Sequence, residues 1–184
     1  MRIWTLNNTI EKYEMIQVKD FDYYYKNYFF PGFKGMSMIQ TWPKVEMKTI
    51  QQGQKSDVPF CSPKVPVFTK KAIEVVSDLL DGVVEYLPLI HSDYTGENQL
   101  FAINTLDARD CIDHDKSERR IFSTGRMGGF IKYAFRLGAV QGAHMFKIYE
   151  LPSREFYSDE FKERVLANNL HGFRFIEVWN SEKE

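Results

Sequence analysis

One order of features occurs twice in this sequence: an amphipathic helix, a glycine, and then a strand. The spacing predicts two principal helices, over about residues 69–81 and 158–170. The strands that follow them are expected over residues 83–89 and 173–179. Both helices and strands are therefore expected in the fold.

Both helices carry signals at their ends. Thr69 and Ser158 are plausible N-caps, and Gly82 and Gly172 stand where a helix would end. The apolar stripe of the first helix consists of Ala72, Ile73, Val76, Leu79 and Leu80. The stripe of the second helix consists of Phe161, Val165, Leu166 and Leu170.

Short apolar or alternating runs predict further strands between and before the helices. They cover residues 1–6, 10–20, 100–106, 120–123, 130–137 and 146–151. Residues 107–116 are rich in acid and predict a short helix or an ordered loop, whereas the Pro-rich residues 51–66 predict a surface connection. The whole pattern predicts a single compact domain over residues 1–184, with a mainly antiparallel or mixed sheet. Residues 1–65 would be its aromatic-rich, irregular N-terminal part and residues 66–179 its α+β part.

Charge excludes some partners. Twenty-four Lys and Arg residues oppose twenty-five Asp and Glu residues, so no global positive field is available to hold nucleic acid. The longest uncharged stretch, residues 137–146, is shorter than the roughly 20 residues of a membrane helix. The N-terminus shows no signal-peptide pattern, and we therefore expect a cytoplasmic protein without a nucleic-acid or membrane partner.

Aromatic residues are concentrated near the N-terminus, where seven of the ten residues from Phe21 to Phe30 are aromatic. Core packing is the favoured role, because each ring buries about 150–250 Å². Stacking on bases or sugars would require a basic groove, yet Asp20 and Asp22 are interleaved with the few lysines nearby. An exposed tyrosine cluster would instead suit a protein interface.

The most polar candidate site is the acidic stretch around His114. It contains Asp107, Asp110, Asp113, Asp115 and Glu118. A solvated face is the simplest interpretation, and an acidic surface for a basic partner is the second. Convergent carboxylates with His114 would instead indicate a small hydrolase or a metal-dependent enzyme. Cys111 precedes His114 by three residues, but no second Cys/His pair near Cys61, His91, His144 or His171 completes a zinc site.

Other catalytic signatures are weak. Cys61 and Cys111 lack a local nucleophile motif and are expected to be buried apolar residues. The glycines at residues 125–129 do not match a phosphate-binding loop and predict a hairpin-like turn. No G-x-S-x-G motif occurs. We therefore assign no catalytic, metal-binding or cofactor-binding residue.

Three blocks of the sequence resemble one family. Residues 66–89 run from an amphipathic helix through glycine into a strand, and residues 100–118 form a strand and an Asp-rich connection that includes Asp115 and Ser117. Residues 145–179 combine a strand, the helix after Ser158, and a final strand. This order, over about residues 65–179, is similar to the bacterial polymorphic-toxin immunity proteins of immunity family eleven, formerly a domain of unknown function.

The resemblance implies a single α+β domain with a mainly antiparallel or mixed sheet. It also implies a non-enzymatic protein without a cofactor that binds a cognate toxin and neutralises it by steric occlusion. The aromatic N-terminal third and the acidic stretch at residues 107–118 are both candidate surfaces, and the sequence does not choose between them. The alternatives are the enzyme that uses the cluster around His114, and a structural or regulatory domain of phage or spore origin.

Overall fold

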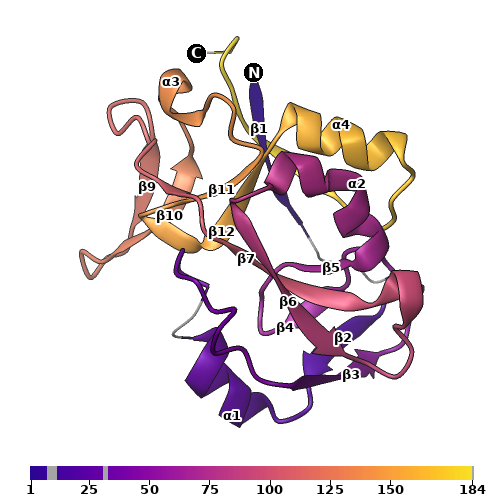
Figure 1. The fold of residues 1–184 in the computed structure, drawn as a ribbon. Helices are drawn as coiled ribbons and strands as arrows, with labels where there is room; N and C mark the ends of the chain where they lie inside the picture. Colours follow the sequence, from indigo (N-terminus) through magenta and orange to yellow (C-terminus); the bar gives the residue numbers. More distant parts are fainter. Residues whose placement is uncertain (8–11, 31–32, 184) are drawn as a thin grey trace.

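A computed structural model describes residues 1–7, 12–30 and 33–183, which form three sheets and the helices around them (Figure 1). The five-stranded sheet contains, in spatial order, β13 (Phe175–Asn180), β1 (Arg2–Leu6), β12 (Leu151–Ser158), β11 (Met145–Ile148) and β8 (Ala108–Arg109). The six-stranded sheet contains β4 (Phe60–Ser62), β2 (Met15–Val18), β3 (Val45–Gln51), β6 (Val84–Ile90), β7 (Leu100–Thr105) and β5 (Val67–Thr69). The two-stranded sheet is a hairpin of β9 (Glu118–Ile121) and β10 (Met127–Lys132).

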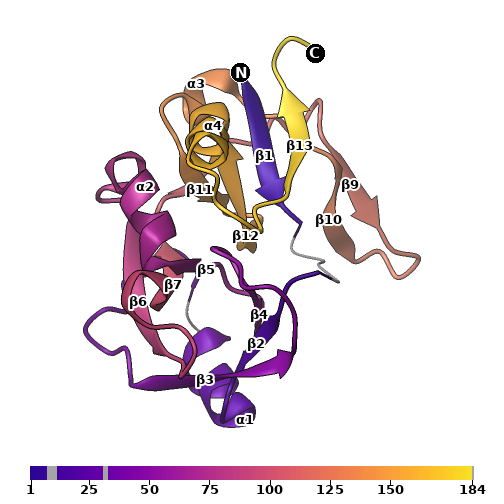
Figure 2. The ribbon, with the colours of Figure 1, turned by 90° about the vertical axis from the view of Figure 1, so that its right-hand side faces the viewer.

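Pairing in these sheets is mostly antiparallel. The parallel pairs are β2 with β4, β3 with β6, and β8 with β11. Figure 2 shows the five-stranded sheet lying above the six-stranded sheet, with β1 and β13 side by side. The structure confirms the prediction of a single compact α+β domain with mixed sheets.

The two principal helices are α2 (Lys70–Leu80) and α4 (Asp159–Ala167), as predicted. The hydroxyl of Thr69 accepts the Ala72 N–H at 3.2 Å, and the hydroxyl of Ser158 accepts the Phe161 N–H at 3.1 Å. Gly82 follows α2 with φ of 69°, where a side chain would be strained.

The remaining helical segments are short. The aromatic run forms α1 (Phe21–Tyr24), which continues as one π-helical turn, η1 (Tyr25–Phe29). The others are a 3₁₀ turn, η2 (Gly96–Asn98), and α3 (Leu137–Val140). No helix of the described residues is both long and apolar enough to cross a membrane.

Several local expectations need correction. The sequence did not predict β3, β4, β5 or β12. β4 lies within residues 51–66, which were expected to form a surface connection, and its Cys61 is buried. β3 and β12 contain several polar residues, whereas β4 and β5 are each only three residues long. The strand expected over residues 130–137 is shorter, since β10 ends at Lys132 and α3 begins at Leu137. Leu166 was expected in the buried stripe of α4, yet 53% of it is exposed because that face of the helix points to solvent.

Other expectations have mixed outcomes. Residues 107–116 form no helix and contain β8 within an ordered loop. The strand predicted over residues 10–20 is observed as β2, while residues 10 and 11 lie outside the described residues. β1, β6, β7 and β13 lie where the sequence places them, within about two residues at each end.

Alternation along the strands separates three apolar clusters. On β1, Ile3 belongs to one cluster and Trp4 to the next. The central cluster joins both sheets to α2 and α4, which lie side by side (Figure 1), and Phe68 and Phe161 meet in it at a ring distance of 6.3 Å. A second cluster fills the far face of the five-stranded sheet. The third lies between the six-stranded sheet and the aromatic run, and includes Phe29.

Asp159 links the N-terminal strand to the start of α4. Its carboxylate accepts hydrogen bonds from the backbone N–H and Nε of Arg2 and from Nε1 of Trp4, each at 2.9 Å. Burial is the largest single effect and opposes ionisation, but these hydrogen bonds outweigh it and lower the pKa of Asp159. The carboxylate also lies in the first turn of α4, where the helix dipole favours an anion.

We expect Asp159→Asn to lower the free energy of unfolding by about 1.5–3 kcal/mol at pH 7, because hydrogen bonds to a charged group are lost. The folded pKa lies below the ordinary value of 3.8, so the stabilisation is present above that pH and disappears as pH falls through the folded pKa. Urea unfolding of the wild type and of Asp159→Asn at pH 7 and pH 3 measures the difference in their free energies of unfolding, which should be smaller at pH 3.

The matched control is Glu160→Gln, since Glu160 lies in the same helical turn with its side chain 57% exposed. It should change stability by less than about 0.5 kcal/mol. Equal losses in the two variants would show that the Asp159 contacts contribute nothing beyond the helix dipole.

Candidate functional site

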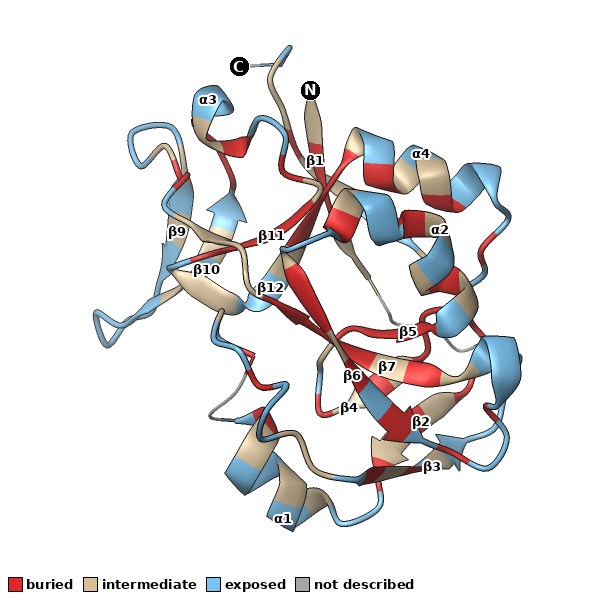
Figure 3. Cartoon of the chain, viewed as in Figure 1, coloured by how far each residue is buried: buried red, intermediate tan, exposed pale blue. Residues whose placement is uncertain are grey.

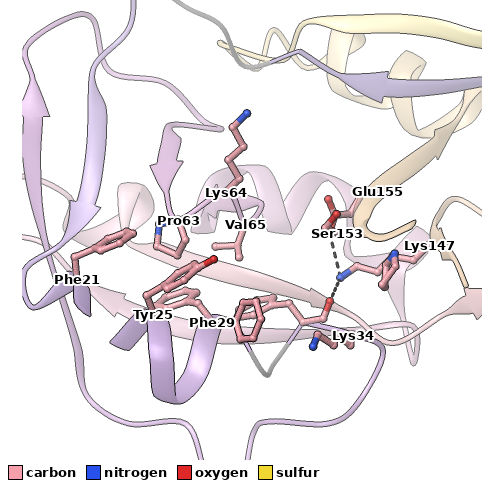
Figure 4. A pocket seen from close by; sticks show the side chains of 13 residues that line it. Phe21, Tyr25, Phe29, Lys34, Pro63, Lys64, Val65, Lys147, Ser153 and Glu155 are labelled. Atoms are coloured by element: carbon pink, nitrogen blue, oxygen red, sulfur yellow. Dashed lines mark hydrogen bonds and ion pairs between the residues drawn. The ribbon is translucent and has the colours of Figure 1, made fainter. Parts of the chain in front are cut away.

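A groove of about 700 Å³ lies where the aromatic run faces the five-stranded sheet (Figure 4). The α1–η1 segment forms one wall, the chain after β4 forms another, and the beginning of β12 closes the end. Its lining residues from these walls are Phe21, Tyr25, Phe29, Phe30, Phe33, Lys34, Pro63, Lys64, Val65, Lys147, Pro152, Ser153 and Glu155. The groove therefore brings together residues that are far apart in the sequence.

The aromatic wall is ordered by ring stacking. Phe21 and Tyr25 stack with centroids 5.3 Å apart, and Phe29 and Phe33 stack at 5.6 Å. Phe29 is buried in the core, whereas Tyr25 is 39% and Phe30 62% exposed. The run predicted to pack in the core thus divides, with one face buried and the other lining the groove.

A buried ion pair closes the polar end of the groove. The side chain of Lys147 is 1% exposed, and its Nζ lies 3.3 Å from Oε1 of Glu155, whose side chain is 12% exposed. The same ammonium donates a hydrogen bond to the carbonyl of Phe33. Burial raises the pKa of Glu155, and the Lys147 charge opposes that rise.

The chemistry of the groove suits protein contact. Exposed aromatic rings offer area that is buried at low entropic cost, and such residues often dominate binding energy. Lys34 lies in the same lining, with its Nζ 5.1 Å from the Phe30 ring centroid, and Lys64 lies across the groove. An apolar side chain next to a carboxylate would complement this surface.

Most of the acidic stretch does not converge on a site, although Asp115 and Glu118 line a second hollow of about 540 Å³ that also contains lysines. Asp107 pairs with Arg109 at 2.8 Å and Asp110 with Arg136 at 2.9 Å, while Asp113 lies 3.6 Å from Lys116. These three carboxylates are therefore each matched by a cation from the same surface.

His114 lies at the surface rather than in a cleft. Its side chain is 59% exposed, and its Nε2 lies 3.1 Å from Glu150. Within residues 1–7, 12–30 and 33–183, no three His, Cys, Asp or Glu side chains are grouped so that they could hold a metal ion.

The remaining histidines take structural positions. His91 is buried against Tyr94, with its Nε2 3.1 Å from the Thr49 hydroxyl. His144 Nδ1 lies 3.0 Å from the Ser158 hydroxyl, at the start of α4. The backbone N–H of His171 donates to Asp57 at 2.8 Å.

Both cysteines are buried and unpaired, as predicted. Cys61 belongs to the cluster beneath the aromatic run, and Cys111 to the cluster on the far face of the five-stranded sheet. Burial raises the pKa of each thiol to about 12. A thiol with such a pKa is almost entirely protonated near neutral pH and is a poor nucleophile.

The glycine-rich residues 125–129 form the predicted hairpin-like turn only in part, since Gly125 and Arg126 lie in the turn whereas Gly128 and Gly129 belong to β10. Gly125 has φ of 78°, and its N–H donates to the Phe122 carbonyl at 2.8 Å. The Phe122 N–H donates to the Arg126 carbonyl at 3.0 Å, which closes the turn between β9 and β10. The sequence predicts the turn, but no motif in it marks the hairpin as a binding element.

The mixed-sheet fold and the aromatic groove together define an α+β domain with a surface suited to protein contact. A family model places it more closely: the chain belongs to the Immunity protein family (Imm11), which matches residues 70–180. This confirms the resemblance drawn from about residues 65–179. A comparison with curated proteins finds no match. The matched part contains α2, α4, Lys147 and Glu155, whereas the aromatic wall lies before it.

The buried pair gives a test of how the groove is held together. We expect Glu155→Gln to lower the free energy of unfolding by about 3–5 kcal/mol, because it leaves the Lys147 ammonium buried without a counter-charge. The double variant Lys147→Met with Glu155→Gln should recover most of that loss. Chemical denaturation of the single and double variants measures the coupling, and additive losses would contradict it.

The thiols give a second test. We expect Cys61 and Cys111 to react with Ellman's reagent at about pH 8 only after denaturation, because both are buried and protonated. Reaction of either thiol in the folded protein as fast as a free cysteine would contradict this expectation. Such a result would favour a Cys–His catalytic site.

Proposed function

We propose that this protein is an immunity protein that binds one cognate toxin and neutralises it by steric occlusion in the cytoplasm of the producing bacterium. The observation that carries the proposal is the match of residues 70–180 to an immunity family. Under this proposal the protein performs no covalent chemistry and requires no cofactor. Its partner is a protein toxin, and neither nucleic acid nor a membrane is part of the function.

The aromatic groove supports this mechanism. Tyr25 and Phe30 present partly exposed rings beside a concave surface, and Tyr23 on the neighbouring α1 is 51% exposed. A stable complex buries about 1,200–2,000 Å², with a few aromatic or charged anchors at its centre. The groove can accept an apolar side chain of the toxin, while Lys34 and Lys64 attract a neighbouring carboxylate.

The enzyme alternative receives less support. A hydrolase or metal-dependent enzyme at His114 would require carboxylates that face one reacting centre. Instead, Asp107, Asp110 and Asp113 each lie beside a cation, and His114 is largely exposed.

The proposed function is tested with the product of the reading frame adjacent to the gene. We expect that product to stop growth when it is expressed alone, and this chain to restore growth when it is co-expressed. Purified, the two proteins should form a complex on size-exclusion chromatography. Absence of a complex, or growth arrest that this chain does not relieve, would contradict the proposal.

The groove is tested with Tyr25→Ala combined with Phe30→Ala. We expect the dissociation constant of the complex to rise about 100-fold, since two aromatic anchors of about 1–2 kcal/mol each are lost. The control combines Ile90→Ala with Leu166→Ala, two residues of similar exposure on β6 and α4. Both double variants should unfold at temperatures close to that of the wild type, and equal binding by the two would remove the groove from the interface.

A further inference from the structure

The hairpin of β9 and β10 projects from the body of the protein (Figures 1 and 2). In the described part of the chain, these two strands pair with each other and with no third strand. Phe130 fixes the base, because its ring lies 5.1 Å from that of Tyr133 in the cluster behind the five-stranded sheet. A two-stranded ribbon is marginally stable in water by itself, so the distal half gains most from a partner.

Large apolar side chains of the hairpin face solvent. Ile121 is 68%, Met127 56% and Ile131 65% exposed. Figure 3 shows exposed residues along both strands, in contrast to the buried strands of the main sheets. Met127 is paired with Ile121 across the ribbon, so these two side chains form a continuous apolar surface. Exposed apolar patches of this kind mark interaction sites.

The same hairpin is strongly basic. Residues 118–132 contain four cations and one carboxylate, a formal charge of +3, whereas the whole chain carries −1. The Arg126 guanidinium lies 5.0 Å from the Phe122 ring centroid, and the Arg119 guanidinium lies 5.0 Å from that of Phe130. These contacts hold two guanidinium groups beside the apolar surface, where they can meet carboxylates of a partner.

Gly128 shapes this surface. A Cβ at that position would lie 2.9 Å from Cε2 of the Phe122 ring and 3.3 Å from Cβ of Arg120. The absence of a side chain therefore lets Phe122 lie across the neighbouring strand. A Cβ at Gly129 would meet no atom within 4 Å, which makes that position a matched control.

We propose that this basic, apolar hairpin inserts into an acidic cleft of the toxin whose walls are apolar. The inference rests on the proposed function and names the chemistry of the partner. Charge complementarity selects an acidic partner, and the exposed Ile and Met side chains select a protein over nucleic acid. A phosphate backbone would match the arginines but would leave those apolar side chains in water.

The charge is tested with Arg120→Glu combined with Arg126→Glu, against the purified product of the adjacent reading frame. We expect the association rate constant at about 50 mM salt to fall at least 10-fold, because rim charges steer encounter. The matched control is Lys48→Glu combined with Lys70→Glu, which changes the net charge equally on β3 and α2 and should alter the rate less than about 3-fold. Raising the salt to about 500 mM should reduce the difference in association rate constant between the two double variants, because salt screens the charges.

The shape is tested with Gly128→Val and its control Gly129→Val. Because Gly128→Val displaces Phe122, we expect its dissociation constant for the toxin to be about 10-fold higher than that of Gly129→Val. The far-ultraviolet circular dichroism spectrum of each variant should match that of the wild type. The combination of Ile121→Ser with Ile131→Ser provides a second apolar test, and we expect a loss of about 10-fold or more in affinity.

The outcomes separate the two proposals. If the wild-type protein forms no complex with the toxin, the proposed function fails and this inference fails with it. If the wild type binds and the hairpin variants bind equally well, the function stands and the hairpin proposal is overturned. A concentration-dependent dimer of this chain that the hairpin variants abolish, or submicromolar binding of duplex DNA at physiological salt, would also overturn it.

Discussion

Burial on both faces of the five-stranded sheet is the constraint on which the rest of the structure depends. Consecutive residues on β1, β11 and β12 point to opposite sides, and both sides carry large apolar groups, as with Phe156 and Tyr157. A sheet that is apolar on both faces must be covered twice. The α2–α4 pair covers one face, and the chain around Phe135 and α3 covers the other.

The first 65 residues connect the two sheets rather than forming a separate layer. β1 lies between β13 and β12 in the five-stranded sheet, while β2, β3 and β4 belong to the six-stranded sheet. The Asp159 hydrogen bonds to Arg2 and Trp4 join the beginning of the chain to α4. The groove lies at this junction, because the α1–η1 segment, which packs against the six-stranded sheet, faces the beginning of β12 in the five-stranded sheet.

The acidic stretch and the hairpin differ in how far their charges are neutralised by neighbouring residues. In the acidic stretch, Asp107, Asp110 and Asp113 are matched locally by cations, which reduces the field it projects into solvent. The hairpin, in contrast, carries an excess of cations on a ribbon that projects into solvent. Under the proposed mechanism, the hairpin and the aromatic groove therefore have different roles. The hairpin attracts and orients the toxin, and the groove supplies apolar contact area.

The sequence by itself determined the α+β class, both principal helices with their capping residues, most of the strands around them, the buried thiols and the turn at Gly125. These features depend on interactions between residues close in the chain, or on the simple alternation of buried and exposed positions. Only the tertiary structure decided that β3 and β12 are strands, because their polar residues are accommodated by neighbours distant in sequence. It also decided that Tyr25 and Phe30 remain accessible while Phe29 is buried, and that Lys147 meets Glu155. A side chain's exposure depends on what packs against it, and in this protein the covering residues come from parts of the chain more than a hundred residues away, as with Phe33 and Lys147.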